Sequence, residues 1–231
     1  MNNSGGKNNN SGSDSIYLVD GEESYVEVGR AIGISVMGVG GGGGGIFSPD
    51  NGKSQGSDGS EDFKKQWLKW LRETFRDQLS EVFVKVYLTS MEMRIKNIVK
   101  LDNELDQLLS VIDSDRSREA GRWFLEGKSE LQRAPQWQKY ARSVEQGDCP
   151  GHLVTVFALQ SALYHLPLLP ALISYVYFEW RAGMLAFGKK QGLANGDVSL
   201  QRFNEEYAES LGVVREVFAR DLQVERSISG L

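Results

Sequence analysis

The feature that most constrains this chain is a long stretch, residues 60–112, that contains neither glycine nor proline. Within it, large apolar side chains recur at steps of three or four residues, the spacing that places side chains on one face of an α-helix. They are Phe63, Trp67, Trp70, Leu71, Phe75, Leu79, Val82 and Val86. The pattern predicts an all-α multi-helix bundle that begins near Asp62, with Ser60 or Asp62 as the helix cap.

Two details of this stretch stay open. Between residues 82 and 88 every second side chain is aliphatic, as in a strand. We favour the helix because the periodicity is helical on both sides. A break must interrupt so long a helix, and both Thr89–Ser90 and Lys96–Asn97 are candidate positions for it.

A narrower apolar stripe follows, at a spacing close to 3.5 residues that suits packing on a second helix. It consists of Ile98, Leu101, Leu105, Leu108 and Ile112. We expect residues 113–115 to end this helix. Residues 116–146 predict one or two shorter helices, with Pro135 at a helix start, and residues 147–151 predict a loop. The expected buried anchors of 116–146 are Trp123, Phe124, Leu125, Leu131, Trp137 and Tyr140.

Residues 153–178 form the most apolar part of the chain and carry no formal charge. They are long enough for a transmembrane helix. Pro167 and Pro170 interrupt them, however, and leave two halves of about a dozen residues each, below the roughly 20 needed to cross the hydrocarbon layer. We therefore favour two buried core helices. After another loop, Ser199 is expected to cap a last amphipathic helix with apolar positions Leu200, Phe203, Tyr207, Leu211, Val214 and Phe218.

Residues 1–59 contrast with this body. Residues 1–13 are Asn, Gly and Ser apart from Met1 and Lys7, a composition that buries too little apolar surface to offset chain entropy. Gly40–Gly45 is a run of glycines, which predicts a flexible tether. We expect residues 1–59 to be a largely disordered leader, residues 60–226 to form a helical domain, and residues 227–231 to fray.

Within the leader, two β-prone runs flank an Asp20–Gly21 turn signal and predict a hairpin or two extended pieces. A lone hairpin is marginal in water. The runs therefore need a surface, supplied by the body or by another protein. We predict a partner-binding segment within 15–37, formed by Ile16, Tyr17, Leu18, Val19, Tyr25, Val26 and Val28.

No motif in the chain indicates a cofactor. Gly52-Lys53-Ser54 matches the end of a phosphate-binding loop, and Gly38–Gly43 satisfies G-x-G-x-x-G, but neither lies between a buried strand and a helix start. His152 and His165 are far apart in sequence, and Cys149-x-x-His152 offers only half of a metal-ligand set. We therefore predict no catalytic residue, no cofactor and no metal.

Among the acidic residues, Glu179 stands out because it directly follows the apolar run. We expect it at the edge of the core, in a structural ion pair with Arg181 or another base. His165, just before Leu166–Pro167, is expected to be a hydrogen-bonded core or helix-end residue.

The charge balance argues against nucleic acid as a partner. The formal net charge is −5, and residues 1–60 hold seven acidic and three basic side chains, so the body is close to neutral. Nucleic-acid binding would require clustered Lys and Arg. The single cysteine permits no intrachain disulfide, and the start of the chain is not a secretory signal. The default location is cytoplasmic, with the inner face of a membrane as an open possibility.

These observations predict a non-enzymatic helical subunit or adaptor of a larger protein assembly, in which the leader is a tethered partner-binding segment. The expected partners are proteins in a hetero-complex, and no small-molecule ligand is evident. One alternative is a membrane-associated component of a bacterial secretion, conjugation or envelope complex, inserted or anchored through 153–178. A second, less favoured alternative is an enzyme with a helical active-site cleft.

Overall fold

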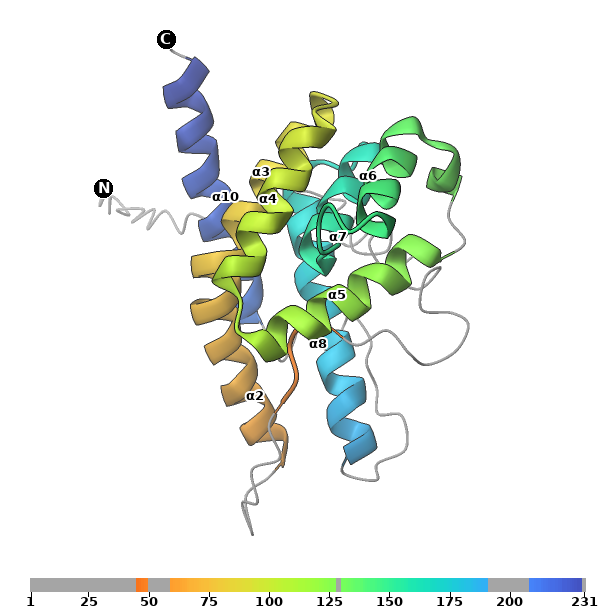
Figure 1. Ribbon diagram of the computed structural model, residues 1–231. Helices are drawn as coiled ribbons and strands as arrows, with labels where there is room; N and C mark the ends of the chain where they lie inside the picture. Colours follow the sequence, from red (N-terminus) through yellow and green to blue (C-terminus); the bar gives the residue numbers. More distant parts are fainter. Residues whose placement is uncertain (1–44, 50–58, 128–129, 191–207, 230–231) are drawn as a thin grey trace, which may run out of the picture.

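The computed structural model describes residues 45–49, 59–127, 130–190 and 208–229, and the regular secondary structure of these residues is entirely helical (Figure 1). The all-α prediction is confirmed. The elements are α2 (Gly59–Trp70), a π-helical segment η1 (Leu71–Leu79), α3 (Ser80–Met91), α4 (Ile95–Leu108), α5 (Val111–Glu126), a 3-10 turn η2 (Glu130–Arg133), α6 (Pro135–Glu145), α7 (Leu153–Leu163), α8 (Leu168–Lys190) and α10 (Ala208–Ser229). Pro135 opens α6, as its position in the sequence predicts.

The first helix is continuous from α2 through η1 to α3. The predicted stripe is buried along it, apart from Trp70, which is half-buried against the same core. Residues 82–88 are helical and not a strand. In the middle the hydrogen bonding changes, and the Ser80 N–H donates to the Phe75 carbonyl, five residues earlier. Leu71, Phe75 and Leu79 follow each other at steps of four, so the wider turn of the π-helix keeps all three on the buried face.

The break in the long helical stretch lies at residues 92–94, between the two predicted positions. Met93 adopts a left-handed backbone conformation with φ 62°. Its N–H donates to the Ser90 carbonyl at 3.0 Å, and the Arg94 N–H donates to the Thr89 carbonyl at 3.2 Å. This pair of bonds is a Schellman ending. The sequence hides it because the left-handed position holds methionine, where glycine is the usual signal.

A second break, at Leu109–Ser110, corrects the prediction for residues 113–115. These residues begin α5 and do not end α4, because the Ser110 hydroxyl accepts the Asp113 N–H and caps the new helix. The chain changes direction between α4 and α5, so the predicted stripe does not continue across it. Ile98 and Leu105 are buried, whereas Leu108 and Ile112 are 59% and 64% exposed.

Helix α7 lies at the centre of the body, and α3 and α5 pack against it (Figure 1). Every residue of α7 from Leu153 to Ala162 is buried. The run 153–178 thus forms two core helices, as favoured from its prolines. The turn between them ends α7 in a second Schellman motif, with His165 at φ 55°. None of the described helices has the length and hydropathy that a membrane crossing requires.

Helices α8 and α10 complete the body on the side of α2. α10 packs on α8 and η1, and the Trp67 indole N–H donates to the Ser210 hydroxyl at 2.8 Å. Val213, Val214 and Val217 are buried apolar residues of α10, and Leu211 and Phe218 are half-buried. α10 extends to Ser229 and so includes residues expected to fray. The proposed cap Ser199 and the apolar positions Leu200, Phe203 and Tyr207 lie outside the described residues.

Residues 45–49 lie between α2 and α8 as a non-helical segment with a bend at Ile46, which we call the strap (Figure 1). Ile46 and Phe47 are 1% and 5% exposed and belong to the main hydrophobic core. A boundary near Asp62 would place both residues in the leader. The physical reason is that Ile46 and Phe47 are bulky apolar side chains between a run of glycines and a polar stretch, and Phe47 packs against Phe63 and Trp67 of α2 and Gly183 of α8.

Candidate functional site

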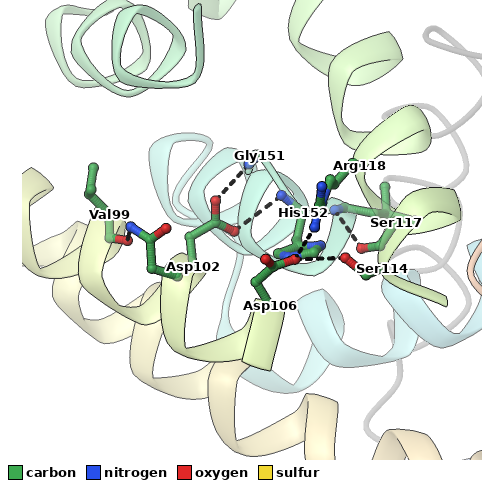
Figure 2. Close-up of polar contacts among 10 residues, drawn as sticks. Val99, Asp102, Asp106, Ser114, Ser117, Arg118, Gly151 and His152 are labelled. Atoms are coloured by element: carbon green, nitrogen blue, oxygen red, sulfur yellow. Dashed lines mark hydrogen bonds and ion pairs between the residues drawn. The ribbon is translucent and has the colours of Figure 1, made fainter. Parts of the chain in front are cut away.

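The turn before α7 is held to α4 by a buried carboxylate. Asp102 is fully buried, and its two oxygens accept the backbone N–H groups of Gly151 at 2.7 Å and His152 at 3.1 Å (Figure 2). Gly121 of α5 lets the same turn approach closely, because a Cβ at this position would overlap the Gly151 carbonyl. The Ser117 hydroxyl accepts the Leu153 N–H at 3.1 Å. Two helices thus satisfy the free N–H groups at the start of α7.

A second carboxylate, Asp106, lies one turn further along α4 and gathers side chains from α5 and the turn. Its Oδ1 accepts from the Ser114 hydroxyl at 2.6 Å and from the Arg118 guanidinium at 2.6 Å (Figure 2). The His152 Nε2 lies 3.1 Å from the same oxygen. Burial raises the pKa of Asp106, but the hydrogen bonds from Ser114 and Arg118, together with the Arg118 charge, outweigh burial and hold this pKa below its usual range. Asp106 is therefore a carboxylate, and it joins α4, α5 and the turn.

This arrangement favours a structural role for His152. The imidazole is fully buried, and burial lowers its pKa, so the ring is neutral. A neutral ring beside a carboxylate must donate its Nε2 proton, since the carboxylate can only accept. The other nitrogen, Nδ1, is buried and has no hydrogen-bond partner among the described residues. Asp106, which accepts from the ring, is already shared with Ser114 and Arg118, and in the described part of the chain no nucleophile forms a hydrogen bond to Nδ1.

Cys149 is poorly suited to nucleophilic chemistry. Burial, together with the nearby Asp102 charge, raises the pKa of its thiol to about 12. A thiol of this kind is protonated at neutral pH and does not react as a thiolate. Among the described residues, no group of three His, Cys, Asp or Glu side chains could hold a metal ion.

The strap forms a second buried polar site, on the other side of the core. The Phe47 N–H donates to the Glu179 Oε2 at 3.1 Å, and the Tyr175 hydroxyl donates to the Glu179 Oε1 at 2.9 Å. The Ile46 N–H is a further donor to the same carboxyl group. Glu179 is fully buried, and no ion pair to it is found within the described residues. The expected ion pair with Arg181 is therefore wrong, and backbone and hydroxyl donors take its place.

Burial dominates the electrostatics of Glu179. It raises the pKa of this carboxyl to about 7, against the effect of its hydrogen bonds, and the charge of Asp113 on α5 adds a small increase. The same carboxyl and its own burial raise the pKa of Tyr175. Near neutral pH, Glu179 is thus poised between its charged and neutral forms while it holds the strap.

The surface near the α4–α5 corner is apolar. Leu108, Val111 and Ile112 are 59%, 78% and 64% exposed. Further along α5 lies a surface depression of about 440 Å³. The described residues that line it are Asp115, Arg118, Glu119, Arg122, Trp123 and Glu126. Three of these side chains are acidic and two are basic.

The seven predicted partner-binding residues, Ile16 to Val19 with Tyr25, Val26 and Val28, lie outside the described part of the chain. His165 lies at the end of α7, exposed, in agreement with a helix-end role. The sequence analysis missed Asp102 and Asp106, which the structure brings to His152 from another helix. A signal was present: both aspartates lie on the side of α4 that carries Ile98 and Leu105.

The chain matches no protein-family model, no curated protein and no solved structure.

Proposed function

We propose that this chain is a non-enzymatic helical subunit or adaptor of a larger protein assembly, and that residues 15–37 are its partner-binding segment. The observation that supports this most strongly is the anchoring of the strap. Because Ile46 and Phe47 are buried against α2 and α8, the leader leaves the body at one fixed point. A flexible chain of the length between Val28 and Gly45 spans about 20–25 Å. The segment would therefore stay at high local concentration beside the body.

The use of the buried polar groups supports a non-enzymatic role. Asp102 is occupied by backbone N–H groups, and Asp106 by Ser114 and Arg118. Glu179 is occupied by the strap and Tyr175. A catalytic acid or base needs a proton donor or acceptor within reach of a substrate, and these groups face protein.

The surface charges favour a protein over nucleic acid as the partner. On the first helix and on α4, lysines stand four residues from glutamates, as in Lys69 with Glu73, Lys85 with Glu81 and Lys100 with Glu104. Paired charges of this kind leave little net positive field for a phosphate backbone.

The test is site-specific photocrosslinking in cells. A photoreactive residue in place of Tyr17 or Tyr25 should give one discrete adduct to another protein. The same residue in place of Lys139, an exposed side chain on α6, should not give that adduct. Equal adducts from both positions would show that the body, and not the leader, lies at the interface.

A matched pair of deletions then measures the contribution of the segment. Removal of residues 1–37 keeps the strap and should weaken binding of the crosslinked partner by roughly tenfold or more, since each tenfold is about 1.4 kcal/mol. Removal of residues 1–14 takes away only Met1, glycines and polar residues and should leave the affinity unchanged. If both deletions bind like the full chain, the proposal is wrong.

A further inference from the structure

The strap meets the body in the way a bound peptide meets its receptor. It lies between α2 and α8 (Figure 1), its Phe47 side chain fills a groove lined by Phe63 and Trp67 of α2 and by Gly183 of α8, and its backbone N–H groups donate to one buried carboxyl, Glu179. A run of glycines precedes it in the sequence and a polar stretch follows it. The strap is thus a short apolar segment between residues that have little apolar surface of their own.

The groove is selective for a phenylalanine. The Phe47 ring packs edge-on against Phe63 and Trp67, with ring centroids 5.6 and 5.2 Å away, and lies 5.7 Å from Trp70. Gly183 of α8 forms the opposite wall, since a Cβ there would overlap the Phe47 ring. Edge-to-face contacts of this kind add to the burial of the ring.

The contacts of the strap also require a glycine at position 45, two residues before Phe47. A Cβ at Gly45 would overlap Glu179 Oε2, the oxygen that accepts the Phe47 N–H. The intervening Ile46 is buried in the main core. The required pattern is therefore glycine, then an aliphatic residue, then phenylalanine.

We propose that this groove is a peptide-binding site for segments of the form glycine–aliphatic residue–phenylalanine, and that residues 45–47 occupy it as an intramolecular ligand. A partner segment of this form binds the body by displacing the strap. The proposal does not depend on which protein the leader binds, because it concerns the body and its groove.

The test uses the full-length chain with Phe47→Ala, which vacates the aromatic pocket, and a fluorescent peptide of residues 43–49, Gly-Gly-Gly-Ile-Phe-Ser-Pro. Saturable binding is expected by fluorescence anisotropy, together with a change in Trp fluorescence because the ring contacts Trp67 and Trp70. The wild-type chain should bind at least roughly tenfold more weakly, because its own strap competes at millimolar effective concentration. A peptide with Ala in place of Phe should bind roughly a hundredfold more weakly.

Two variants keep the test decisive. Gly45→Ala weakens the strap by the clash with Glu179 and leaves the aromatic pocket intact, so it should also take up the peptide even if Phe47→Ala folds poorly. The double variant Phe47→Ala/Gly183→Ala narrows the pocket and should not bind. Absence of saturable binding to a folded Phe47→Ala or Gly45→Ala chain would overturn the proposal, as would equal binding to wild type or to the double variant.

Discussion

Glu179 gives the stability of this protein a pH dependence of definite sign. The carboxyl has a pKa of about 7 in the folded chain, raised chiefly by burial, against about 4.3 in an unfolded chain. The folded state therefore binds the proton more tightly, and the contribution of Glu179 to stability is fully present below about pH 4.3. It is lost as the pH rises toward 7, because the ionised group is then buried without a cationic partner.

The size of the effect follows from the difference between the two pKa values. Two to three pKa units correspond to about 3 kcal/mol. Glu179→Gln keeps the shape and an oxygen that can accept the Phe47 N–H, but it carries no charge. The variant should match wild type near pH 4 and exceed its free energy of unfolding by about 3 kcal/mol at pH 8.

The assay is urea unfolding, followed by far-UV circular dichroism, of wild type and variant at a series of pH values. The difference between the two chains isolates Glu179, because His152 and the surface carboxylates contribute equally to both. Glu73→Gln is the control: this side chain is exposed on η1, and its replacement should change the stability by less than about 0.5 kcal/mol at every pH. A wild-type-minus-Glu179→Gln difference that stays constant from pH 5 to 8 would refute the reasoning.

Two further predictions concern the turn before α7. Asp102→Ala leaves two buried N–H groups without an acceptor and should lower the free energy of unfolding by about 2–4 kcal/mol. Glu104→Ala, at an exposed position of the same helix, should change the free energy of unfolding by less than about 0.5 kcal/mol. Equal effects of the two substitutions would contradict the role of Asp102. Cys149, with a pKa of about 12, should react with a thiol reagent at pH 8 far more slowly in the folded chain than in urea, and fast labelling of the folded chain would show that the thiol is accessible.

The sequence was enough to predict those helices and helix ends that are determined by residues close to one another in the chain. The spacing of apolar side chains from Phe63 to Val86 predicts a buried face, and Pro135 predicts the start of α6. The prolines at 167 and 170 predict a division of the apolar run into α7 and α8. In each case the signal and its consequence lie within a few residues of each other.

The helix ends were harder because the residues at them are atypical. Met93 and His165 occupy left-handed positions where glycine is common. No glycine in the sequence therefore marks these two helix ends. Ser110 and Asp113 form a helix-start signal. The prediction that residues 113–115 end the preceding helix did not take this signal into account.

The buried polar sites could not be predicted, because their members come from separate helices. Asp106 meets His152 across a separation of 46 residues, and Phe47 meets Glu179 across 132. Only tertiary packing brings such residues together. The strap nevertheless had a local signal, since Ile46 and Phe47 are a bulky apolar pair directly after a run of glycines.

The folded body begins with the strap, and two truncated chains test this directly. A chain that starts at Gly45 should unfold at the same urea concentration as the full-length chain. A chain that starts at residue 50 lacks Ile46 and Phe47 and should lose at least about 3–5 kcal/mol, the typical loss for removal of one buried phenylalanine ring. If both truncated chains are as stable as the full-length protein, the strap contributes nothing to the core and the claim is wrong.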